Sequence, residues 1–96
     1  MTINDEVTNM LKSVAKSLNL VYAETPGRGG GVSFVYGEKI LVMFASFVEP
    51  DGRVNIVATI PNQRMPLSWG QYKADEIADK AKFTVLTKTR ELMEKK

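Results

Sequence analysis

The sequence predicts an α+β domain with the order α-β-β-β-β-α, a four-stranded antiparallel meander sheet packed by an N-terminal and a C-terminal helix. Helical periodicity of the apolar residues is confined to the two ends of the chain, and apolar runs separated by glycine and proline turns fill the middle. The connections between these runs are too short for parallel crossovers, so the strands are expected to be antiparallel. A chain of 96 residues is expected to form a single domain over 1–96.

An amphipathic helix is predicted over residues 3–18. Its apolar residues recur with the spacing of one helix face: Ile3, Val7, Met10, Leu11, Val14, Ala15 and Leu18. Asp5 and Glu6 lie in the first turn, where the helix dipole favours anions. Asn19 tolerates the left-handed conformation and is predicted to end the helix.

The four predicted strands cover residues 20–24, 32–36, 39–48 and 53–60. The first two are separated by TPGRGGG, which is too rich in glycine and proline for a regular element and predicts a loop. Gly37-Glu38 matches a two-residue type II′ turn, with glycine at the first central position. Pro50-Asp51-Gly52 predicts a three-residue hairpin loop, and residues 61–66 are expected to be irregular.

The strand over 39–48 is apolar on both faces, which is unusual in a chain this short. One face carries Ile40, Val42, Phe44 and Val48, and the other carries Leu41, Met43, Ala45 and Phe47. The three-residue loop pairs Val48 with Val54, and the N-terminal helix is expected to pack on that first face.

The composition of the second face depends on the Gly37-Glu38 turn. A two-residue loop pairs Tyr36 with Lys39 and Phe34 with Leu41, whereas a three-residue loop would send the aromatic residues to the first face. We favour the two-residue loop. The candidate oligomer or partner face is then Phe34, Tyr36, Leu41, Met43, Phe47 and Val57.

A C-terminal helix is predicted from about residue 70, after a capping box formed by Ser68 and Gln71. Its main apolar stripe is Ala74, Ile77, Ala78, Ala81, Val85 and Leu92, and a second side carries Tyr72, Phe83, Leu86 and Met93. Residues 82–89 are rich in β-branched side chains, so a short helix followed by an extra strand and a terminal turn is the alternative.

The second face is too apolar to be left to water, and three covers are conceivable. The C-terminal helix, a second subunit, or a ligand, peptide or unstacked bases would each serve. A terminal helix that is apolar on two sides favours a partner, so the sequence predicts a homo-oligomer with a dimer as the favoured form. The alternative to self-association is a monomer in which both helices complete the core.

Composition argues against catalysis. The chain has no cysteine and no histidine, which excludes thiolate chemistry and the commonest proton-transfer side chain and metal ligand. We therefore expect no enzyme activity, no cofactor, no metal and no small-molecule substrate. Asp75 and Asp79 could share a cation, but the helix dipole and a Glu76–Lys80 pair explain these acids without one.

The absence of disulfides and of a long apolar run predicts a cytoplasmic protein without a membrane anchor.

The function predicted from the sequence is a small non-enzymatic, self-associating binding module. The alternative is a single-stranded nucleic-acid-binding protein, in which aromatic rings stack on bases and cations follow the backbone. The candidate contacts for that alternative are Arg28, Lys39, Arg53, Arg64, Trp69 and Tyr72. A net charge of +2 is mild for a nucleic-acid binder.

Overall fold

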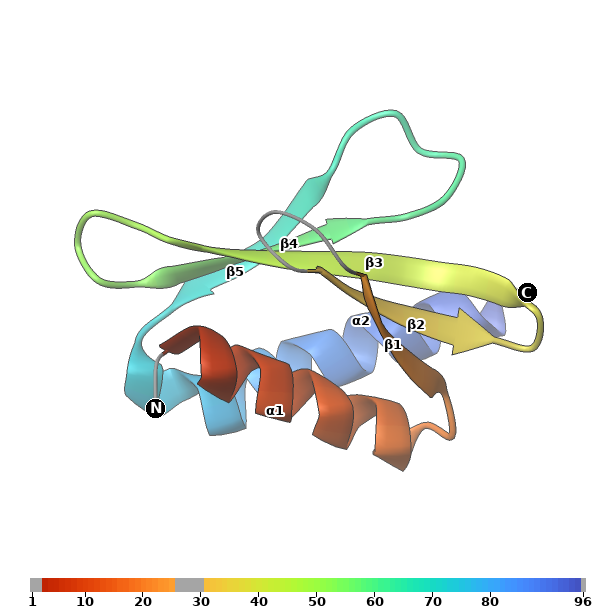
Figure 1. Ribbon diagram of the computed structural model, residues 1–96, viewed down its shortest axis with the longest axis horizontal. Coiled ribbons are helices and arrows are strands. Elements are labelled where there is room, and N and C mark those ends of the chain that lie inside the picture. Colours follow the sequence, from red (N-terminus) through yellow and green to blue (C-terminus); the bar gives the residue numbers. More distant parts are fainter. Residues whose placement is uncertain (1–2, 26–30, 96) are drawn as a thin grey trace.

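A computed structural model describes residues 3–25 and 31–95 of the chain. The elements in order are α1 (Ile3–Ser17), β1 (Val21–Thr25), β2 (Gly31–Tyr36), β3 (Lys39–Val48), β4 (Val54–Thr59), β5 (Leu67–Tyr72), the 3₁₀ turn η1 (Ala74–Glu76), the π-helical turn η2 (Ile77–Ala81) and α2 (Lys82–Glu94). The strands form one antiparallel sheet in the order β1-β2-β3-β4-β5, and both helices lie on the same side of it (Figure 1). The α+β class and the meander are confirmed, but the sheet has five strands and not four.

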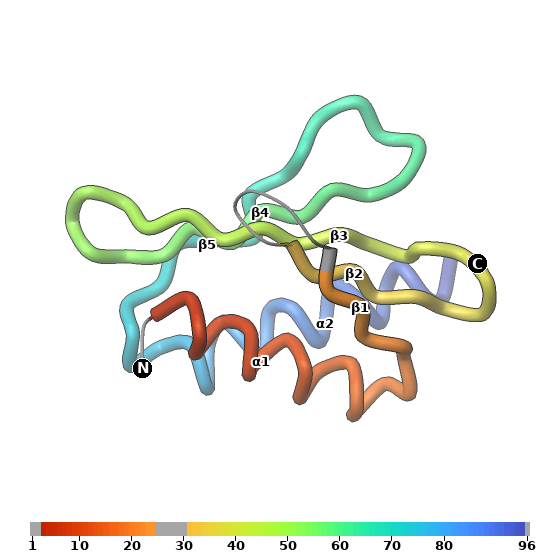
Figure 2. The backbone as a smooth tube through the Cα atoms, viewed as in Figure 1, coloured from red at the N-terminus to blue at the C-terminus, as the bar shows by residue number. Residues whose placement is uncertain are grey.

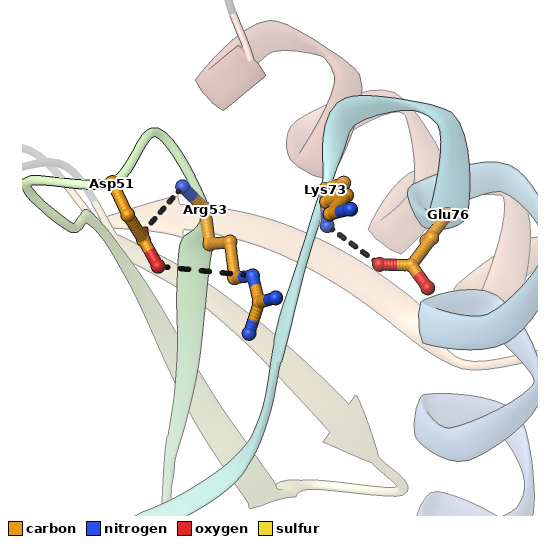
Figure 3. A network of polar contacts seen from close by, with 4 residues as sticks. All are labelled: Asp51, Arg53, Lys73 and Glu76. Atoms are coloured by element: carbon orange, nitrogen blue, oxygen red, sulfur yellow. Dashed lines mark hydrogen bonds and ion pairs between the residues drawn. The ribbon is translucent and has the colours of Figure 1, made fainter.

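The additional strand is β5, and it replaces the start that was predicted for the C-terminal helix. The Ser68 hydroxyl donates to Asn55 Oδ1 of β4 at 2.7 Å, so it is not a helix cap. The helical segment begins later, where the Lys73 N–H donates to Glu76 Oε1 at 2.9 Å (Figure 3). Polar residues around Trp69 concealed the alternating pattern of this strand in the sequence.

The turn between β3 and β4 has the predicted register, with Val48 opposite Val54. The Glu49 N–H donates to the Arg53 carbonyl at 2.7 Å, and Gly52 has a φ of 91° that favours glycine. An ion pair of 3.7 Å joins Asp51 to Arg53 at the hairpin tip (Figure 3).

The turn between β2 and β3 pairs Tyr36 with Lys39, as the two-residue loop predicts, but the register beyond it is different. Val35 lies opposite Ile40 and Phe34 lies opposite Val42, so a β-bulge at Leu41 accommodates one extra residue on β3. The predicted pairing of Phe34 with Leu41 is wrong. Because the bulge shifts the alternation, both side chains enter the core, where Phe34 is 0% and Leu41 is 2% exposed.

The core lies between the sheet and the layer formed by α1 and α2, which run beneath the strands (Figure 2). It includes Val7 and Val14 from α1, and Ile56 and Val85 from the sheet and α2. Asn19 ends α1 with a φ of 57°, as predicted. The β-branched residues 82–89 are helical, because α2 packs its Val85 side against the core and tertiary contacts override the intrinsic preference.

Candidate functional site

The face of the sheet opposite the two helices is the candidate functional site, and we call it the open face. Strand alternation from the observed registers places on it the apolar residues Val21, Ala23, Val35, Ile40, Met43, Ala45, Phe47 and Val57. The polar residues of the same face are Ser33, Asn55, Thr59, Ser68 and Gln71. Neither α1 nor α2 covers it (Figure 1).

The open face is apolar, and its most exposed apolar side chains lie near the two ends of β3 and on the edge strand β1, whereas the middle of β3 is half-buried. Phe47 is 55% exposed, and Val21 and Ile40 are exposed as well, while Met43 and Val57 are half-buried. Within strands β1 to β5, none of the described side chains of this face carries a charge, and Arg53 lies at its margin just before β4. An exposed surface of a monomer normally carries charged groups, so an uncharged apolar sheet face is typical of an interaction surface.

Two polar side chains of the open face, on β4 and β5, pair with each other. The Ser68 hydroxyl donates to Asn55 Oδ1, and it accepts a hydrogen bond of 3.3 Å from the Gly70 N–H. At this end of the sheet, Asp51 and Arg53 pair with each other in the β3–β4 hairpin. A partner that covered this part of the face would therefore not leave the Ser68 and Asn55 side chains without hydrogen-bond partners.

The structure separates the predicted partner-face residues into three groups. Met43, Phe47 and Val57 lie on the open face. Phe34 and Leu41 belong to the core, and Tyr36 is exposed at the end of β2, opposite Lys39. The open face also contains Val21, Val35 and Ile40, and the predicted placement of Ile40 on the same face as Val42 is wrong. Val21 pairs with Val35, and Val35 pairs with Ile40. The bulge at Leu41 then places this group on the same face as Met43 and Phe47.

The predicted nucleic-acid contacts that the structure describes do not form one surface. Trp69 is 6% exposed and packs edge-on against Phe44, with ring centroids 5.3 Å apart. The Tyr72 hydroxyl donates to the Trp69 carbonyl at 2.6 Å, and Lys88 Nζ lies 5.8 Å from the Trp69 ring.

The remaining cations of that set lie apart. Lys39 begins β3, and Arg53 lies in the hairpin between β3 and β4, immediately before β4. Arg64 lies in the connection between β4 and β5. Arg28 lies outside the described residues. The described members of the set therefore include no row of cations beside accessible rings.

Other candidate chemistry is explained by local structure. Asp75, Glu76 and Asp79 form no metal site, and within residues 3–25 and 31–95 no cluster of three metal-ligating side chains is found. The backbone hydrogen bond from Lys73 and the hydrogen bond of 3.0 Å from Lys80 lower the pKa of Glu76. The Glu76–Lys80 pair therefore accounts for the acid at this position. In the described part of the chain, no helix is long and apolar enough to cross a bilayer.

No protein-family model, curated protein or solved structure significantly matches this chain. The function must therefore be inferred from the residues of the chain itself.

Proposed function

We propose that the protein is a small non-enzymatic binding module that self-associates through its open face, with two copies packed sheet against sheet. The observation that carries this proposal is an uncharged apolar face on a sheet whose two helices both lie on the other side. Packing Phe47 and Val57 against their counterparts would remove apolar surface from water, which is the main driving force of association. A two-fold axis brings the same patch of each copy into contact, so one apolar face suffices for a closed dimer.

The size of the open face is consistent with a small dimer interface. Five strands about 4.8 Å apart, with about six residues each at about 3.3 Å per residue, give a face of roughly 20 Å by 20 Å in projection. Protruding side chains raise the accessible area above that roughly 400 Å². A standard interface buries about 800 Å² on each partner, so we expect a dimer at the lower end of the range that dissociates at micromolar concentrations.

The geometry does not favour the nucleic-acid alternative. Base stacking requires accessible rings beside cations. Among the described residues, Phe47 is the one aromatic side chain that the registers place on the open face, and Trp69 packs in the core. We therefore expect no oligonucleotide binding through this face.

The test is size-exclusion chromatography with light scattering over a range of protein concentrations, comparing Phe47→Asp with Phe83→Asp. Both substitutions put the same charge at an exposed phenylalanine, but Phe83 is 69% exposed on α2, on the other side of the sheet. We expect a dimer for the parent chain and for Phe83→Asp, and a monomer for Phe47→Asp. Circular dichroism should show that all three proteins are folded.

Two results would contradict the proposal. A parent chain that stays monomeric at hundreds of micromolar excludes self-association through this face. Equal assembly of Phe47→Asp and Phe83→Asp places the interface elsewhere. A fluorescent single-stranded oligonucleotide at low salt is added as a separate arm, and binding that weakens steeply with salt would revive the nucleic-acid function.

A further inference from the structure

A cavity of about 340 Å³ lies on the helix side of the sheet, between α1 and strands β1 to β3. Its floor is formed by the buried side chains Val7, Leu11, Val32 and Phe44. The volume falls at the lower end of the range of about 300–1,000 Å³ that is typical of small-molecule sites. This site is separate from the open face, because the sheet lies between the two.

The cavity follows from the sheet registers and from short side chains. Glu24, Val32 and Phe44 form one row across β1, β2 and β3. Farther along β3, the Ser46 hydroxyl donates to Asn4 Oδ1 of α1 at 3.0 Å and joins the start of the helix to the sheet. Valine, threonine and serine side chains line much of the intervening space and do not fill it.

The polar edge of the cavity carries a single negative charge. The Tyr22 hydroxyl donates to Glu24 Oε1 at 3.1 Å, and among the described residues that line the cavity Glu24 alone is charged. Burial, together with the hydrogen bond to Glu24, raises the pKa of Tyr22 to about 12. Tyr22 therefore remains a hydrogen-bond donor at neutral pH and holds the carboxylate at the rim. Lys12 Nζ lies over the Tyr22 ring, 5.5 Å from its centroid.

We propose that this cavity binds a small amphipathic amine, with its ammonium group at the Glu24 carboxylate and its hydrocarbon part over Val32 and Phe44. A carboxylate beside an apolar floor attracts a cation that carries an apolar body. The same carboxylate repels organic acids. A neutral analogue of the same shape retains the apolar contact but lacks the ion pair.

The proposal is tested by titrating ¹⁵N-labelled protein with 2-phenylethylamine and with 2-phenylethanol, which have nearly the same shape and differ in charge. Amide shifts should change for residues around the cavity, including Thr8 and Val32. We expect the amine to bind at least about fivefold more tightly, which is the effect of one unit-charge pair about 4 Å apart in fully hydrated surroundings.

Glu24→Gln should weaken amine binding by that same factor and leave the alcohol unaffected. The matched control is Glu6→Gln, which removes a carboxylate from α1 at a different groove, between that helix and η2. Equal affinities for the amine and the alcohol, or unchanged amine binding by Glu24→Gln, would overturn the role of the carboxylate.

A second variant tests the location independently. Thr8→Leu adds apolar volume inside the cavity, so it should abolish the shifts caused by both probes without lowering the melting temperature. Undiminished binding would place the ligand elsewhere, and the absence of shifts around the cavity in the parent chain would refute the site. Phe47→Asp should still bind the amine, which separates this proposal from self-association.

Discussion

Thr89 provides a sharp test of the packing of α2. Its side chain is 0% exposed, and its Oγ1 is buried without a hydrogen-bond partner. Valine has nearly the same shape and lacks the hydroxyl, so Thr89→Val removes an unpaired polar group without opening a cavity. Threonine and valine also have similar intrinsic helix propensities, so the backbone term nearly cancels.

The magnitude follows from the cost of burying a hydroxyl that has no partner. Protein mutational data put this cost at about 1–3 kcal/mol, so Thr89→Val should stabilise the protein by about that amount. For a domain of this size, each 1 kcal/mol raises the melting temperature by about 4–8 °C. Urea unfolding followed by circular dichroism measures the free energy, and the m-value should not change.

Thr87→Val is the matched control, because Thr87 is exposed on the same helix. It should change the free energy of unfolding by no more than about 0.5 kcal/mol. The proteins are compared at equal concentration, since association stabilises the folded state by mass action. A Thr89→Val protein that is less stable than the parent chain would mean that the hydroxyl makes a hydrogen bond, and it would refute this reasoning.

Three further predictions concern backbone strain and ionisation. Gly52→Ala should lower the free energy of unfolding by about 1–3 kcal/mol because of the positive φ alone. Gly70→Ala should lower it further, since an added Cβ would lie 2.5 Å from the Tyr72 hydroxyl oxygen. Urea unfolding ranks the two variants, and the reverse order would contradict the described β5 backbone. The lowered pKa of Glu76 means that its stabilising effect is complete above the ordinary carboxyl pKa and is lost as the pH falls through the folded-state pKa. The melting temperatures of the parent chain and Glu76→Gln should therefore converge as the pH falls below the ordinary carboxyl range, and a difference that does not shrink in acid would be inconsistent with this. The pKa of about 12 for Tyr22 means that the contribution of its hydroxyl to stability is complete below the ordinary tyrosine pKa and is lost as the pH rises through 12. Tyr22→Phe should therefore lose less stability than the parent chain as the pH is raised. Tyrosinate absorbance follows the titration, and identical plots of melting temperature against alkaline pH for the two proteins would disprove the assignment.

The sequence by itself determined the elements whose signals are local. The periodicity of residues 3–18, the left-handed Asn19 and the Pro50-Asp51-Gly52 loop each depend on a few neighbouring residues, and the structure agrees with all three. Met43, Phe47 and Val57 of the open face were also found from the sequence, because the register of the β3–β4 hairpin follows from its turn.

Only the tertiary structure decided where the two helices lie, which residues form the open face and where the cavity is. A bulge at Leu41 has no sequence signal of its own, yet it moves Phe34 into the core and Ile40 out of it. The strand β5 and the helical form of residues 82–89 depend on contacts with distant parts of the chain, and such contacts outweigh local propensity. The physical reason is that one extra residue in a strand reverses the face of every side chain that follows it. Burial against distant elements then decides which strand register and which helix position is stable.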